Sequence, residues 1–467
     1  MGVPKKQTVT AASQPAFGFG VERKRAAARL AFAPATPWPP IVSLPPPNDT
    51  GINCSAAGAS RGRDRSHPNR EHPAMTVSRW FQIPATLALA GGAIATAWAL
   101  AGTASRPQLT SSEAANQTVA RHLAQAGTIG ALTTDNWNPS AGVALLTADY
   151  AVAADGSTRY RTVQAAVDAA VAAGGTMRRY ISVKPGTYKE LVCVPAAAPP
   201  ITLFGLGSAP AATTISFDNA NPTPKPSGSA THPCASNASS TTVGTSDSGT
   251  VTVRAAQFQA RNLAIVNSYV EDTYAGSNQS AVALALRGDK AVLENVALTG
   301  NQDTLLVSAG SANTVIRAFF KGGSIEGDTD FIFGSGVAVF SGSTIRYTAA
   351  RRGAGNGGVV FAPSTRPGSG YGFLAVASTF DAVGGPAANT VSLGRAWDES
   401  VGSLSNYVNG SSPNGKVVIR ESSLGAHLRK SAPWNASTIG RPYCSSGCTQ
   451  SANRFYEYAN SGAGSAD

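Results

Sequence analysis

Six short apolar segments in the second half of the chain share one phase, and this repeat restricts the fold more than any other feature. The segments are residues 262–265, 295–298, 322–325, 342–345, 377–380 and 422–424. Their last apolar residues stand 33, 27, 20, 35 and 44 residues apart. Irregular periods of roughly 20–45 residues are typical of solenoid coils that differ in loop length. Because the segments are short and bounded by Gly, Asn, Ser and Asp, they favour a parallel β-helix over a β-sandwich.

One segment of the body has a helical pattern instead. Residues 162–173 (TVQAAVDAAVAA) carry apolar residues at helical spacing, and Gly174 and Gly175 follow as a stop signal. We therefore expect an all-β, single-domain parallel β-helix with a short N-terminal helical cap. Residues 106–150 are assigned to the same cap.

The N-terminal region has the layout of an exported protein. Residues 1–74 are rich in Pro, Ala and Arg without apolar periodicity, as in a disordered leader. Met75 opens a short basic stretch, an uncharged run follows, and small residues end it, so 75–105 is predicted to be a signal peptide. We interpret Met75 as the true start and residues 1–74 as an upstream extension that is not translated.

A transmembrane anchor is the alternative for this run, which is about long enough to span a bilayer. It contains Pro84 and two glycines, however, and no basic cluster follows it. We expect residues 106–467 to be a secreted, extracellular β-helix domain that leaves the membrane after signal cleavage and acts as a monomer.

Charge and cysteine content agree with export. Most of the net charge of +11 lies before residue 80, and no basic cluster follows, so a nucleic-acid partner is not expected. Apart from Cys54 in the leader, the chain has four cysteines, which fit two disulfides in a secreted protein. Three pairings exist, and we favour Cys193–Cys234 with Cys444–Cys448. A zinc site needs four ligands in closely spaced pairs. Only Cys444 and Cys448 are close in sequence, so no metal is expected.

The repeat places two aspartates side by side. Asp303 stands five residues after Leu298, and Asp330 stands five residues after Ile325. Equal phase on successive coils means stacking at about 4.7–4.9 Å. Two close carboxyls divide into a protonated acid and an ionised base or nucleophile. The alternative is that each aspartate only hydrogen-bonds its own turn. Gln302, an amide donor, and the apolar run after Asp330 favour the catalytic interpretation.

Five segments around these aspartates resemble the pectinesterases (pectin methylesterases). They are residues 186–190 (GTYKE), 279–284 (QSAVAL), 302–305 (QDTL), 330–334 (DFIFG) and 393–397 (LGRAW), in the family's order. The resemblance implies a right-handed parallel β-helix that hydrolyses the methyl esters of pectin to pectate and methanol, without metal or cofactor. Its role would be pectin degradation or cell-wall modification.

The resemblance also implies a role for each matched catalytic residue. Asp330 would be the nucleophile on the ester carbonyl. Asp303 would protonate the departing methanol and then activate water. Gln279 and Gln302 would donate hydrogen bonds to the oxyanion, and Arg395 would orient Asp330 and keep it ionised.

Substrate binding would fall to Gln279, Arg395 and two aromatic platforms, Phe333 and Trp397. The sequence departs from the family pattern in two places. Ala396 replaces a usual proline, and the interval between the two aspartates is longer, which an insertion at residues 308–315 can absorb. Neither departure removes a chemical group.

Other functions stay open at this stage. Arg351 and Arg352 could bind a uronate carboxylate or form a solvated pair. A related fold could hydrolyse other acyl esters or thioesters. A β-helix glycosidase would also use paired carboxylates. A polysaccharide-binding β-helix is the non-enzymatic alternative, and it has no need of a buried acid pair.

Overall fold

The computed structural model describes residues 102–309, 311, 313–449 and 452–466, which belong to one compact unit. The leader 1–74 and nearly all of the predicted signal peptide 75–105 lie outside the described residues, so both stay predictions. Within the part of the chain that is described, no helix is long and apolar enough to cross a membrane.

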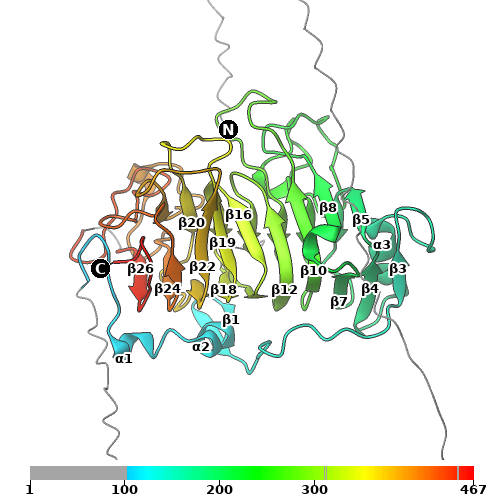
Figure 1. Cartoon of the computed structure of the whole chain (residues 1–467), viewed down its shortest axis with the longest axis horizontal. Helices are drawn as coiled ribbons and strands as arrows, with labels where there is room; N and C mark the ends of the chain where they lie inside the picture. Colours follow the sequence, from blue (N-terminus) through cyan, green and yellow to red (C-terminus); the bar gives the residue numbers. More distant parts are fainter. Residues whose placement is uncertain (1–101, 310, 312, 450–451, 467) are drawn as a thin grey trace, which may run out of the picture. The chain divides into compact units, whose positions relative to one another are not determined.

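Parallel strands stack coil upon coil along one axis, which confirms the predicted β-helix (Figure 1). The sixteen-stranded sheet contains β3 (Tyr150–Val152), β4 (Arg179–Val183), β5 (Gly186–Lys189), β7 (Ile201–Gly205), β8 (Thr213–Phe217), β10 (Gln259–Asn267), β12 (Ala291–Thr299), β15 (Arg317–Lys321), β16 (Ser324–Gly327), β18 (Val337–Ser341), β19 (Thr344–Thr348), β21 (Phe373–Val376), β22 (Thr379–Val383), β24 (Lys416–Arg420), β25 (Ser423–Leu424) and β26 (Arg454–Tyr458). The seven-stranded sheet contains β6 (Val192–Val194), β9 (Val251–Val253), β11 (Leu284–Leu286), β13 (Leu305–Val307), β17 (Thr329–Gly334), β20 (Val359–Pro363) and β23 (Ser392–Gly394).

The remaining elements are short. A small antiparallel sheet contains β1 (Gln125–Thr128), β2 (Ala131–Thr134) and β14 (Thr314–Val315). The helices are α1 (Ser111–Ala114), α2 (Val119–Ala124) and α3 (Val163–Ala173), with 3₁₀ turns η1 (Pro210–Ala212), η2 (Thr245–Asp247) and η3 (Leu404–Asn406).

The predicted phase of the repeat is the observed register. The pairs are Ile265–Leu298, Leu298–Ile325, Ile325–Ile345, Ile345–Phe380 and Phe380–Leu424, and all six side chains are buried. Three residues before each of them the backbone has a positive φ, at Asn262, Asn295, Gly322, Gly342, Ala377 and Glu421. This left-handed residue bends every coil at one level, which Asn and Gly tolerate better than other residues.

Replacing Ala377 by glycine should stabilise the fold. Its φ is 49° and its side chain is exposed. The left-handed region costs a non-glycine residue about 1–2 kcal/mol, more than the roughly 0.5–1 kcal/mol that glycine loses in chain entropy. We expect Ala377→Gly to raise the free energy of unfolding by about 0.5–1 kcal/mol in urea titration. Ala382→Gly, within β22, is the control and should lower it; a loss in both variants would contradict the argument.

The N-terminal end of the solenoid is covered by α3, as predicted. Thr162 caps the helix by accepting a hydrogen bond from Ala165 N–H, and Gly174 ends it with a φ of 60°. Val163 and Val167 lie on the face that joins the solenoid core.

Residues 102–149, here called the N-terminal strap, do not cap that end, which corrects the assignment of 106–150. Figure 1 shows the strap, in cyan, running beside the strands from the β26 end to the β3 end. The strap covers an outward-facing apolar ladder that comprises Val292, Phe319, Val339, Leu374 and Val418, one residue from each of five stacked strands. Leu109, Leu123 and Val143 of the strap pack on this ladder. These strands are apolar on both faces. One face packs in the solenoid core, and the strap shields the other face from solvent.

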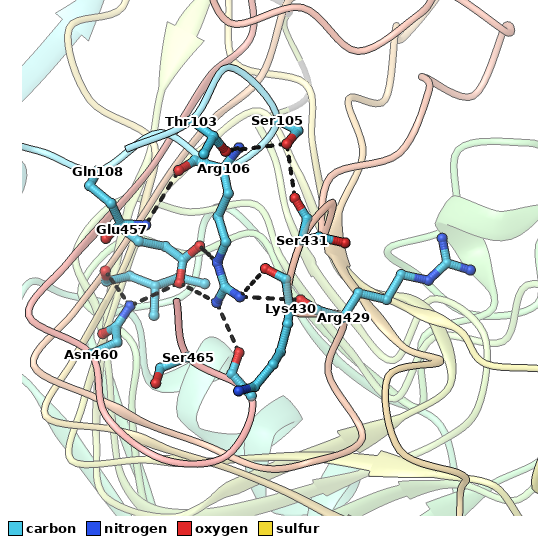
Figure 2. Close-up of polar contacts among 12 residues, drawn as sticks. Thr103, Ser105, Arg106, Gln108, Arg429, Lys430, Ser431, Glu457, Asn460 and Ser465 are labelled. Atoms are coloured by element: carbon cyan, nitrogen blue, oxygen red, sulfur yellow. Dashed lines mark hydrogen bonds and ion pairs between the residues drawn. The ribbon is translucent and has the colours of Figure 1, made fainter. Parts of the chain in front are cut away.

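The first residues of the strap also close the C-terminal end (Figure 2). Leu109 N–H donates to the Glu457 carbonyl of β26 at 2.8 Å. The Arg106 guanidinium binds both carboxylate oxygens of Glu457, at 2.7 and 2.8 Å. It also donates to the carbonyls of Lys430 (2.6 Å) and Gly464 (2.9 Å). Both charged side chains are almost fully buried, with 3% and 1% exposed.

Both disulfides have the pairing favoured from the sequence. Cys193 and Cys234 lie 5.5 Å apart at Cα and are buried. Cys444 and Cys448 lie 6.4 Å apart at Cα.

Candidate active site

A cleft of about 270 Å³ opens beside the seven-stranded sheet and gathers most of the predicted site. It is lined by Thr245, Ser246, Ser277, Asn278, Ser280, Gln302, Asp303, Asp330, Phe333, Ala362, Arg395, Trp397 and Thr438. Six of the seven residues singled out from the sequence line it, and Gln279 does not.

The two aspartates are neighbours because their strands stack in the predicted phase. Leu305 of β13 pairs with Ile332 of β17, and the Asp303 N–H donates to the Thr329 carbonyl at 3.0 Å. Asp303 and Asp330 both have left-handed backbones, with φ of 67° and 48°. The register of β17 shifts between Thr329 and Ile332. Such irregularities re-aim side chains, and here both carboxyl groups reach the cleft.

Arg395 holds Asp330 through a bidentate ion pair. It follows β23, and its backbone N–H donates to the Phe361 carbonyl at 2.9 Å. Its Nε lies 2.9 Å from Oδ1 of Asp330, and its Nη2 lies 2.6 Å from Oδ2. Burial lowers the pKa of the guanidinium, but the ion pair outweighs burial and the pKa is raised. The guanidinium therefore stays charged, and the ion pair fixes the orientation of the Asp330 carboxyl group.

Asp303 has the opposite electrostatic environment. Burial, and then the charge of Asp330, raise the pKa of Asp303 well above its usual range. A hydrogen bond from Ser280 and the charge of Arg395 oppose the rise without cancelling it. The raised pKa favours a protonated Asp303 beside the Arg395-bound Asp330, an arrangement that fits acid and nucleophilic chemistry.

Gln302 and Ser280 form the polar wall beside Asp303. Nε2 of Gln302 donates to Ser280 Oγ at 3.1 Å and lies 3.4 Å from Asn278 Oδ1. Ser280 is buried. Ser280 was not among the predicted site residues, although alternation along an extended segment allows only one of residues 279 and 280 to face the cleft.

Gln279 is the residue that faces away. Its Oε1 accepts from the Tyr269 hydroxyl (2.7 Å) and from Asp272 N–H (3.1 Å). Its Nε2 donates to the carbonyls of Tyr274 (3.2 Å) and Gly276 (2.7 Å). The side chain is only 5% exposed. The expectation that Gln279 serves the oxyanion and the substrate is thus corrected, because its amide is occupied in holding this loop.

The two predicted platforms differ in accessibility. Phe333 is buried, and its ring lies 5.6 Å from that of Trp397 at 58°. Trp397 is half-buried, so Phe333 supports Trp397 from below. Ala396, at the position of the missing proline, is fully buried, and its carbonyl accepts from Thr438 N–H at 3.0 Å. The turn that presents Trp397 is therefore kept.

Arg351 lies outside the cleft, where carboxylates of the chain already bind it. Its Nε and Nη2 contact both carboxylate oxygens of buried Asp328, at 2.7 and 2.6 Å, and its Nη1 contacts Glu271. Arg352 lies 3.5 Å from the same aspartate. The structure therefore favours a structural role for Arg351 over a uronate contact.

One group of metal-ligand side chains lies close together among the described residues, Cys193, His232 and Cys234. The two sulfurs are bonded to each other, whereas metals bind the thiolate. The His232 ring contacts the Cys234 N–H at 3.2 Å. This group is a disulfide environment and does not fit a metal.

The fold and the cleft define a parallel β-helix enzyme with a paired-carboxyl site. The pectinesterase family model matches residues 149–402. A pectinesterase of Ralstonia nicotianae is 60% identical over 393 residues, which cover 83% of this chain and 99% of that protein. The solved rice weevil pectin methyl esterase superposes with a TM-score of 0.65 at 35% identity, over 78% of this chain and 99% of that one. A putative acyl-CoA thioester hydrolase of Escherichia coli, YbhC, is 33% identical over 78% of this chain and 90% of its own length.

The chain belongs to the pectinesterase family and is a carboxylic ester hydrolase of that family.

Proposed function

We propose that this enzyme hydrolyses the methyl esters of pectin, with Asp330 as the nucleophile and Asp303 as general acid and base. The observation that carries the proposal is the Asp330 carboxylate, held at 2.6 and 2.9 Å by Arg395 beside a second, buried carboxyl. The 60% identical pectinesterase of Ralstonia nicotianae supports pectin as the substrate.

In the first step a carboxylate oxygen of Asp330 attacks the ester carbonyl carbon. The oxyanion that forms accepts a hydrogen bond from Gln302, whose Nε2 gives up its 3.4 Å contact with Asn278 Oδ1 to donate it. The bond to the methoxy oxygen breaks as the protonated carboxyl of Asp303 gives its proton to that oxygen. Methanol leaves, and an anhydride joins Asp330 to the substrate.

In the second step the ionised Asp303 takes a proton from water, which attacks the anhydride carbonyl. The Asp330 carboxylate departs, and the product is a galacturonate carboxyl. Asp303 keeps the proton that it took from water, the product acid releases its own proton to solvent, and the enzyme returns to its starting state. One group serves as acid and then as base because its pKa is raised.

The proposal includes an extracellular site of action. The signal peptide at 75–105, the two disulfides and a polymeric substrate fit one another. We propose that the exported chain begins near residue 106 and acts as a monomer. N-terminal sequencing of the secreted protein tests the first point, and a product that begins before residue 75 would overturn it.

A panel of three substrates tests the activity itself. The full chain is incubated with highly methylated pectin, with polygalacturonate and with an acyl-CoA thioester, and methanol, reducing ends and free thiol are measured. We expect methanol from pectin only. Reducing ends without methanol would indicate a glycosidase. Thiol release without methanol would favour a thioester hydrolase, the activity for which YbhC is named.

The two glutamines should behave differently when replaced. Gln302→Ala removes an oxyanion donor and is expected to lower kcat by about 10²–10³-fold. Gln279→Ala removes four hydrogen bonds of a loop, so it should lower the thermal midpoint and change kcat much less. Methanol kinetics and thermal melts of both variants give the comparison. A larger loss of kcat in Gln279→Ala would return the oxyanion role to Gln279.

A further inference from the structure

Ser280 occupies the position between the acid and the amide of the site. It lies four residues before β11, is buried, and lines the cleft with Gln302 and Asp303. Its backbone is fixed, because Asn221 N–H donates to its carbonyl at 2.7 Å. Asn278 Oδ1 accepts from both the backbone N–H of Ser280, at 3.0 Å, and its hydroxyl.

We propose that Ser280 is a positioning residue of the esterase site, whose hydroxyl oxygen holds the Gln302 amide and whose hydroxyl proton alternates between Asn278 and Asp303. The inference rests on the proposed function of Asp303. It assigns to Ser280 the position in the cleft that the sequence pattern predicted for Gln279.

The alternation follows from proton counting. A hydroxyl has one proton to donate and can accept on its oxygen at the same time. Gln302 Nε2 donates to that oxygen at 3.1 Å, so the proton points elsewhere. While Asp303 is protonated it donates its own proton, and Ser280 can donate to Asn278. Once Asp303 has given its proton to methanol, the carboxylate needs a donor. Ser280 lines the same cleft as Asp303, and we infer that its hydroxyl turns from Asn278 to the carboxylate.

The charges around Asp303 show why this donor matters. Asp330 and Asp328 add negative charge, and Arg395 adds positive charge. Burial and Asp330 raise the pKa of Asp303, whereas the hydrogen bond from Ser280 lowers it. Without that bond the carboxyl would hold its proton more tightly. Ser280 thus keeps Asp303 able both to release a proton and to act as a base.

Replacement of Ser280 and of Asn278 should shift the pH dependence in opposite directions. The step reported by kcat/KM needs protonated Asp303, so its alkaline limb follows the pKa of Asp303. Ser280→Ala removes the donor and is expected to move this limb up by about one pH unit. Asn278→Ala removes the competing acceptor and should move the limb down. Ser308→Ala is the matched control, because this buried hydroxyl bonds Ser335 at 2.9 Å and no carboxyl.

The measurements are methanol release against pH and the infrared band of the protonated carboxyl, assigned by its loss in Asp303→Asn. Opposite shifts in the two variants, with none in Ser308→Ala, support the proposal. Lower activity of Ser280→Ala with an unmoved limb and an unmoved infrared titration would show a merely structural role and overturn it. If the native chain releases no methanol, the proposed function fails, while the infrared titration still reports on Ser280.

Discussion

Methanol release by the Asp330→Asn variant is expected to be slower than that of the native chain by about 10⁴-fold or more. The amide keeps the shape of the carboxyl but lacks the negative oxygen that attacks the ester. It also gives Arg395 no charge to hold, although the native guanidinium binds both oxygens of Asp330 within 3.2 Å. Initial rates on highly methylated pectin, with circular dichroism as the check on folding, measure the effect.

A matched aspartate elsewhere on the solenoid provides the control. Asp381 of β22 binds Arg346 in the same bidentate way, at 3.0 and 2.6 Å, but lies outside the cleft. Asp381→Asn therefore makes the same chemical change and should leave turnover as it is. If Asp330→Asn kept more than about one per cent of the native rate, the esterase would stand and the role of Asp330 as nucleophile would be withdrawn.

Arg106→Met is expected to lower the free energy of unfolding by about 3–5 kcal/mol. The Glu457 carboxylate, with 1% of its side chain exposed, would lose its cation, and three backbone carbonyls would lose a charged donor. The change also loosens the strap where Arg106 binds Glu457 of β26, the last strand of the sheet (Figure 2). Urea titration followed by tryptophan fluorescence measures the loss.

Two further variants separate the buried charge from the lost contacts. Arg346→Met breaks a pair that is about one-third exposed at each partner and should cost about 0–1 kcal/mol. Arg106→Met combined with Glu457→Met removes both charges and should recover part of the stability lost in the single variant. A loss in Arg106→Met no larger than that in Arg346→Met would show that the strap does not depend on this pair.

The fold and the paired aspartates could be predicted because they depend on phase along the chain. Parallel coils repeat the same side-chain pattern at each level, so residues at equal phase, such as Leu298 and Ile325, pair directly. Asp303 and Asp330 follow that phase by the same number of residues and meet for the same reason. The helix at residues 162–173 could be predicted from local sequence, because its capping residue and its stop signal adjoin it.

Other features depended on contacts between distant segments, and no local pattern encodes them. Whether residue 279 or 280 faces the cleft was decided by the loop that binds the Gln279 amide. Arg351 forms ion pairs with Asp328 and Glu271, which only the folded coils bring close to it.

The course of the strap was settled by the apolar ladder on the outside of the sheet and by the Arg106–Glu457 pair, 351 residues apart. The sequence by itself therefore determined the coil register, the acid pair and the family. The tertiary structure decided which side-chain donors and acceptors can bind a substrate. Their availability depends on the hydrogen bonds that each side chain makes within the folded protein.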